Sequence, residues 1–215
     1  MNKHPRAGSP VLRPLARAML CAALLSSVTG CVPLVVGGAV AGAVASNDRR
    51  TLGAQTEDKA IAIKADLRLP KITGPDVHIN VNSFNRMVLL TGEVKDEAMK
   101  ATVEREVKAI DAVASVVNEL TIAGPASYTS RSNDALITTK VKASLIEMKT
   151  ISAISFKVVT ERGVVYLMGR VTQREGQVAA DVARNVSGVA KVVKVFEYIS
   201  EDEARALSPQ SKIQL

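Results

Sequence analysis

Side chains able to do covalent or metal chemistry are few in this chain. Its cysteines and histidines are Cys21, Cys31, His4 and His78. Cys31 follows an apolar run, residues 18–28, which itself follows four basic residues. That run has the length of a signal-peptide core and is shorter than the roughly 20 apolar residues that span a bilayer. We therefore predict that residues 1–30 are a signal peptide, which would remove Cys21.

The sequence VTGCVP around Cys31 resembles the bacterial lipobox, in which a peptidase cuts before a cysteine that then carries acyl chains. Two or more chains anchor a protein stably, because each buried CH₂ contributes roughly 0.8 kcal/mol. By this resemblance Cys31 is the lipidation site. Val32, where inner-membrane lipoproteins usually have Asp, implies the outer membrane with the protein facing the periplasm. A plain signal peptide with an unmodified cysteine is the alternative.

Composition excludes several classes of function. Loss of residues 1–30 removes four basic and no acidic side chains, so the formal charge falls from +7 to +3 and His78 is the one histidine left. A disulfide and a Cys- or His-rich metal cage are then excluded, and we expect no metal site and no cofactor. A single histidine, with acidic residues scattered among basic ones in 96–108, predicts no catalytic residues. The absence of Trp disfavours nucleic-acid binding.

The remaining chain contains an internal repeat. Three segments recur in the same order: VLLTGEV (88–94) with VYLMGRV (165–171), IKADL (63–67) with VKASL (141–145), and AVASVVN (112–118) with GVAKVVK (188–194). Their spacings are 77, 78 and 76 residues. Such constant order and spacing indicate two copies of one folding unit.

Each copy reads as helix, strand, strand, helix, strand. In the second copy Asn133 or Asp134 is expected to cap a helix whose residues Ile137, Val141 and Leu145 share one face. A hairpin turn with Gly163 at positive φ follows, then a helix over 173–186 and a half-buried strand over 191–199. The predicted fold class is α+β, with two helices on one face of a small three-stranded sheet in each unit.

The segments ITTKVKASL, VYLMGRV and AADVARNVSGV resemble the BON domain, and two such domains behind a lipobox resemble a family of outer-membrane lipoproteins. The resemblance runs from Cys31 to about Ser200. The expected organisation is a lipidated N-terminus and linker (31–55), BON domain 1 (56–123), an inter-domain linker (124–130), BON domain 2 (131–200) and a flexible tail (201–215). We expect the apolar residues after Cys31 to form a tether near the membrane; a buried strand is the alternative.

The resemblance implies a non-enzymatic function. Members of this family bind anionic phospholipids, such as phosphatidylglycerol and cardiolipin, through the second BON domain, gather at the division site and support envelope integrity. The formal charges are consistent with lipid binding by the second copy, because residues 56–123 carry a net charge of −2 and residues 131–200 a net charge of +5. Each basic side chain near an anionic surface contributes roughly 1 kcal/mol. An envelope protein partner is the alternative, with the first copy as an interaction module that regulates amidase activation or barrel assembly.

The expected phospholipid-binding residues lie on the first helix of the second copy. They are Asn133, Leu136, Ile137, Lys140, Ala143 and Ser144. An exposed Leu136 beside Lys140 suits insertion between headgroups, with the ammonium on phosphate. The family has a tryptophan at the position of Leu136, so we expect weaker or slightly displaced lipid binding here. Alternatively, Leu136 packs on the first domain or the linker.

Overall fold

The computed structural model describes residues 48–75 and 77–207, which all belong to one compact unit, residues 42–215. Several predictions lie outside the described residues: the signal peptide, lipidation at Cys31, the tether up to residue 47, and the tail from residue 208 onward.

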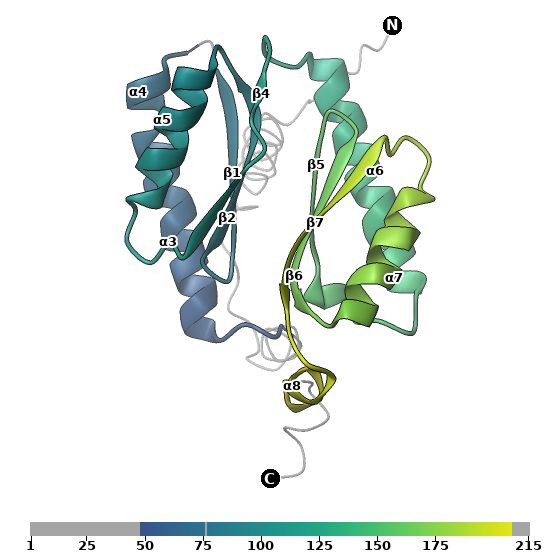
Figure 1. Ribbon diagram of the computed structural model, residues 1–215. Helices are drawn as coiled ribbons and strands as arrows, with labels where there is room; N and C mark the ends of the chain where they lie inside the picture. Colours follow the sequence, from purple (N-terminus) through teal and green to yellow (C-terminus); the bar gives the residue numbers. More distant parts are fainter. Residues whose placement is uncertain (1–47, 76, 208–215) are drawn as a thin grey trace, which may run out of the picture. The chain divides into compact units, whose positions relative to one another are not determined.

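The first repeat builds one mixed sheet. Its elements are α3 (Leu52–Arg68), α4 (Pro70–Thr73), β1 (His78–Phe84), β2 (Met87–Val94), α5 (Glu97–Lys108), β3 (Ser115–Asn118) and β4 (Thr121–Ile122). β1 pairs antiparallel with β2, while β3 and β4 pair parallel with β2. Figure 1 shows α3, α4 and α5 together on one side of this sheet.

The second repeat has the same topology. Its elements are α6 (Tyr128–Glu147), the 3₁₀ turn η2 (Ala153–Ser155), β5 (Lys157–Glu161), β6 (Val164–Val171), α7 (Gln173–Arg184), β7 (Lys191–Tyr198) and α8 (Glu201–Ala206). The sheet order is β5-β6-β7, with the hairpin antiparallel and β7 parallel to β6. α6 and α7 cover one side of it (Figure 1). The predicted α+β fold is confirmed, and Gly163 has the expected positive φ of 76°.

The two central strands are buried on both faces. In β2, Val88, Leu90 and Val94 pack with the helices of the first repeat. The next residue in the alternation, Leu89, belongs to a different cluster that contains residues of both repeats: Phe84, Leu89, Tyr166, Met168 and Val195. Each sheet therefore buries one face against its helices and part of the other against its sister repeat, which enlarges the core of units near the lower size limit for stability.

The helical part of the repeat has a spacing different from the predicted one. Asp58, Ile61 and Ala65 are the buried residues of α3, and α6 buries Asp134, Ile137, Val141 and Leu145. The buried positions match at 76 residues, so the alignment of IKADL with VKASL at 78 residues is wrong. Short apolar and basic runs on helices resemble one another at several registers, and only burial distinguishes them.

The prediction that Asn133 or Asp134 caps the helix is also wrong. α6 begins at Tyr128, inside the expected linker 124–130, because the Ser127 hydroxyl accepts the backbone N–H of Ser130. Asp134 instead lies within the helix, where its carboxylate accepts the backbone N–H groups of Arg162 and Gly163, each at 2.8 Å. A buried helical aspartate thus binds the hairpin turn.

Both flanking segments contact the second repeat where they are described. In the expected linker, Arg49 is buried and donates to both carboxylate oxygens of Glu175, at 2.7 and 2.8 Å. In the expected flexible tail, residues 201–206 form α8, with Ser200 as its N-cap and Ala204 buried. The carboxylate of Glu203 accepts from Arg170 at 2.7 Å. Ion pairs between charged side chains thus hold these segments on the second repeat.

Candidate functional site

Four of the six predicted phospholipid-binding residues form one exposed stripe on α6. Asn133, Leu136, Lys140 and Ala143 are all exposed, and Leu136 has 61% of its surface accessible. Their spacings of three and four residues place them one above another along the helix. Ser144, at the side of this stripe, is half-buried. Leu136 does not pack on the first repeat or on the described part of the linker, because its side chain faces solvent.

Ile137 does not belong to the exposed stripe. Its side chain is 1% exposed and packs in the core of the second repeat with Val141 and Leu145. It lies about 100° around the helix from Leu136, on the face that binds the sheet. Ile137 holds α6 in place and has no surface to offer a lipid, so it is removed from the candidate contacts.

An apolar hollow beside the stripe was not predicted. Ile146 is 71% exposed and Ile154, on the 3₁₀ turn η2, is 46% exposed. Together with Lys142 they line a cavity of about 160 Å³ whose other walls are core residues, among them Leu145 and Phe156. Ile146 follows the buried Leu145 directly, so the helical period alone predicts that Ile146 lies away from the core face. The proximity of Ile154 was not, because the turn that carries it has no periodic pattern.

The lysines of α6 are available to an outside anion. Lys140 and Lys142 are exposed, and neither has an ion pair or hydrogen bond with any residue in the described ranges. The corresponding helix of the first repeat differs. There Lys64 lies 3.2 Å from Asp111, and Arg68 donates to the carbonyl of Glu106. The cations of α3 are thus partly neutralised by their own repeat, whereas those of α6 are not.

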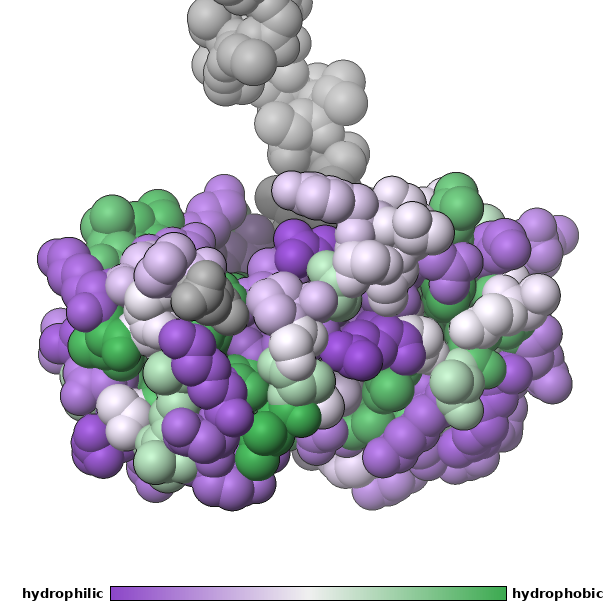
Figure 2. All heavy atoms as spheres, turned by 90° about the horizontal axis from the view of Figure 1, so that it is seen from above, coloured by the Kyte–Doolittle hydropathy of each residue, from purple (hydrophilic) through white to green (hydrophobic). Residues whose placement is uncertain are grey.

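Hydrophobic exposure on the surface is local. Figure 2 shows hydrophobic residues as separate patches among hydrophilic ones on the face that it draws. The exposed large side chains of the second repeat are Tyr128, Leu136, Ile146, Ile154 and Tyr198. None of the described helices is both long enough and apolar enough to cross a membrane.

Hydrogen bonds at the N-terminus of α7 hold the linker against the second repeat. Thr172 and Glu175 form a capping box, and Glu175 also receives the bidentate ion pair from Arg49. Burial alone would raise the pKa of the Glu175 carboxyl, but the hydrogen bonds from Arg49 and from the backbone of Thr172 outweigh it, so its pKa is lowered. The chain that follows the predicted anchor is thereby held on the repeat that carries the α6 stripe.

Comparison with known proteins agrees with this architecture. The BON domain model matches residues 62–124 and 133–200. The outer membrane lipoprotein DolP of Haemophilus influenzae is 35% identical over 190 residues, which cover 87% of this chain and 98% of that protein. A 21 kDa hemolysin of Actinobacillus pleuropneumoniae is 31% identical over 71% of this chain and 79% of its own length. The osmotically inducible protein Y of Escherichia coli is 28% identical over 71% of this chain and 78% of its own length.

The two matched regions coincide with the two α+β repeats, and they hold the α6 stripe in the second. The resemblance inferred from the repeated segments is confirmed. This chain belongs to the BON domain family, of which it carries two copies.

Proposed function

We propose that this protein is an outer-membrane lipoprotein that binds anionic phospholipids through its second BON domain and supports envelope integrity at the division site. Acylated Cys31 is its anchor, and the two domains face the periplasm. The lipobox-like sequence around Cys31 and the similarity to a relative named as an outer membrane lipoprotein support the anchoring. The match covers 98% of that relative's length, so it includes both BON domains.

One observation carries the assignment of lipid binding to the second domain. On α6, Lys140 and Lys142 are exposed beside Leu136 and Ile146 and have no partners among the described residues. An apolar side chain that enters the headgroup region, with an ammonium near the phosphate, is the pattern of an interfacial contact. A handful of such contacts is sufficient when an anchor already raises the local concentration.

The anchor is tested by replacing Cys31 with alanine. We expect the protein to leave the membrane fraction for the soluble fraction, because no acyl chain can then be attached. The measurement is fractionation of envelopes in high salt, followed by immunodetection. A protein that stays in the membrane fraction in high salt after this replacement would show that another segment holds it there.

The lipid contact is tested by Lys140→Glu in a protein that begins at residue 32 and so lacks the anchor. The substitution changes the local charge by two units, and at roughly 1 kcal/mol per unit we expect binding to phosphatidylglycerol vesicles to weaken about 30-fold. Leu136→Glu should weaken it to a similar degree by removing the apolar contact. Co-sedimentation with vesicles, with neutral phosphatidylcholine vesicles in parallel, measures both.

Two matched controls separate a local effect from a general one. Lys59→Glu makes the same charge change on exposed α3 of the first domain, and Ile63→Glu makes the same apolar-to-acidic change there. Both should bind vesicles nearly as well as the unmodified protein. Equal losses from the α3 and α6 variants would contradict the assignment to the second domain.

A protein-interaction module is the second candidate function, and one observation favours it. α3 of the net acidic first domain exposes Leu52, Ile63 and Leu67 by 59–69% of their surfaces. Exposed apolar residues on one helix suit a protein partner, such as a regulator of envelope amidases or a component of barrel assembly. Under this reading Ile63→Glu would impair envelope integrity in cells, while Leu136→Glu and Lys140→Glu would not.

A further inference from the structure

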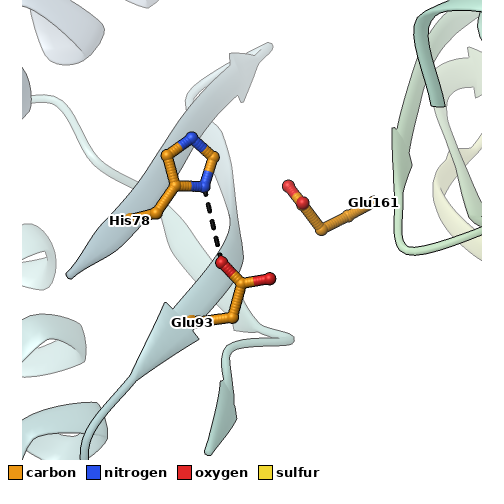
Figure 3. A group of neighbouring side chains, drawn as sticks. All are labelled: His78, Glu93 and Glu161. Atoms are coloured by element: carbon orange, nitrogen blue, oxygen red, sulfur yellow. Dashed lines mark ion pairs between the residues drawn. The ribbon is translucent and has the colours of Figure 1, made fainter. Parts of the chain in front are cut away.

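Three groups able to bind a metal converge where the two BON domains meet. His78 begins β1, Glu93 lies opposite it on β2, and Glu161 ends β5 of the second domain. One ligand atom from each of the three lies within 4.8 Å of the other two. Figure 3 shows Glu161 extending from a separate ribbon toward His78 and Glu93. The group is thus assembled from strands far apart in the sequence.

The polar atoms of this group are buried and incompletely satisfied. Glu93 is fully buried and Glu161 is 7% exposed. His78 Nδ1 and Glu93 Oε2 are both inaccessible to solvent, and neither has a hydrogen-bond partner in the described part of the chain. They lie 3.6 Å apart, which is too long for a hydrogen bond. Buried polar atoms without partners are costly, and a cation placed between these two atoms would satisfy both.

The neighbouring side chains satisfy the other oxygens of the two carboxylates. Arg162 Nη1 lies 3.1 Å from Oε1 of Glu93, and Asn80 Nδ2 donates to Oε2 of Glu161 at 2.7 Å. Each carboxylate thus has one oxygen bound from outside and the other left for the shared centre. Of the arginines nearby, Arg162 contacts Glu93, and Arg131 lines the adjacent cavity.

We propose that His78, Glu93 and Glu161 bind a Zn²⁺ ion that joins the two BON domains. An imidazole nitrogen with two carboxylate oxygens suits zinc, whereas Mg²⁺ and Ca²⁺ prefer oxygen ligands alone. Two ligand atoms 3.6 Å apart fit the corners of a tetrahedron whose centre is roughly 2.2 Å from each, close to zinc–ligand lengths. The widest separation, up to 4.8 Å, requires the Glu161 carboxylate to move inward on binding.

A cavity beside the cluster has room for a fourth ligand. It has a volume of about 290 Å³ and is lined by His78, Arg131, Asp134 and Glu161 among others, with Glu93 behind them. A water molecule there would complete a tetrahedral site. Because the ligands come from both domains, the ion would fix one domain to the other. The prediction of no metal site considered only cysteine and histidine, and this site differs because carboxylates provide two of its three ligands.

Isothermal titration calorimetry with Zn²⁺ tests the proposal on the full-length protein, purified in detergent and stripped with EDTA. We expect one Zn²⁺ per chain and much weaker binding of Mg²⁺. Loss of a residue that merely supports a metal ligand typically costs 10- to 100-fold in affinity, so Glu161→Gln, which removes a ligand, should cost at least about 10-fold. Glu97→Gln, on the exposed surface of α5, is the matched control and should bind normally.

A second measurement does not depend on any variant folding. After loss of residues 1–30, His78 is the one histidine left in the sequence, so its ring nitrogens can be assigned directly by NMR. Zn²⁺ should shift the Nδ1 resonance of His78, and Mg²⁺ should not. The proposal is overturned if Zn²⁺ leaves His78 unshifted, if Mg²⁺ binds equally well, or if Glu161→Gln and Glu97→Gln bind Zn²⁺ with the same affinity.

Discussion

Replacing Gly92 with alanine is expected to destabilise the first BON domain by about 4 kcal/mol. Gly92 has a φ of +111°, and a Cβ atom there would lie 2.1 Å from the carbonyl oxygen of His78. That oxygen belongs to the backbone of the paired strand β1, so it cannot move aside as a flexible side chain would. A left-handed backbone costs about 1–3 kcal/mol for a residue with a side chain, and overpacking a similar amount.

Urea unfolding followed by circular dichroism measures the loss of stability. Hydrogen exchange should also show faster exchange in β1 and β2 of the variant. Gly53→Ala is the matched control, because Gly53 lies in helix α3 and a Cβ there meets nothing closer than 3.8 Å. It should be neutral or stabilising by up to about 1 kcal/mol. Equal stabilities of the two variants would contradict the close approach of β1 and β2.

The repeated architecture was predictable because its signals are local. The strand alternation in β2 and β6 and the hairpin turn at Gly163 are encoded within a few residues of each feature. The burial of Leu89 and Tyr166 in a cluster shared by the two repeats was not encoded in that way. It depends on packing between the sheets, and the alternation of a strand does not say what covers its second face.

The candidate site was partly predictable for the same reason. A helical period places Leu136 and Lys140 on one exposed stripe, and it also directs the Ile137 side chain toward the core. The hollow formed by Ile146 and Ile154 depends on an irregular turn. The group of His78, Glu93 and Glu161 depends on two domains meeting, and no spacing in the sequence relates its members.

Asp58 is the residue whose removal should have a comparably large effect, since it organises the first hairpin. Its carboxylate accepts the backbone N–H groups of Asn85 and Arg86, each at 2.8 Å, and the Ser83 hydroxyl at 2.6 Å. Arg50 also donates to it at 2.8 Å. Asn85 and Arg86 both have positive φ, so the turn is held in a conformation that these residues seldom adopt alone. Asp134 binds the equivalent turn of the second repeat.

We expect Asp58→Ala to lower the free energy of unfolding by about 3–5 kcal/mol at neutral pH, because several buried donors lose their acceptor at once. Urea unfolding measures this loss. Asp66→Ala, on the exposed side of the same helix, should change stability by less than about 0.5 kcal/mol. Similar losses in the two variants would show that the hairpin turn is stable without Asp58.

The stability that Asp58 contributes should also depend on pH. Burial acts to raise the pKa of Asp58, but the hydrogen bonds from Ser83, Arg86, Arg50 and Asn85 outweigh it, so the pKa in the folded protein is lowered. Its contribution to stability is therefore complete above the ordinary aspartate pKa and is lost as the pH falls through the lowered value. The stability difference between the unmodified protein and Asp58→Ala should accordingly shrink below about pH 4. A difference that stays constant into acid would mean that the hairpin is held by packing rather than by the ionised carboxylate.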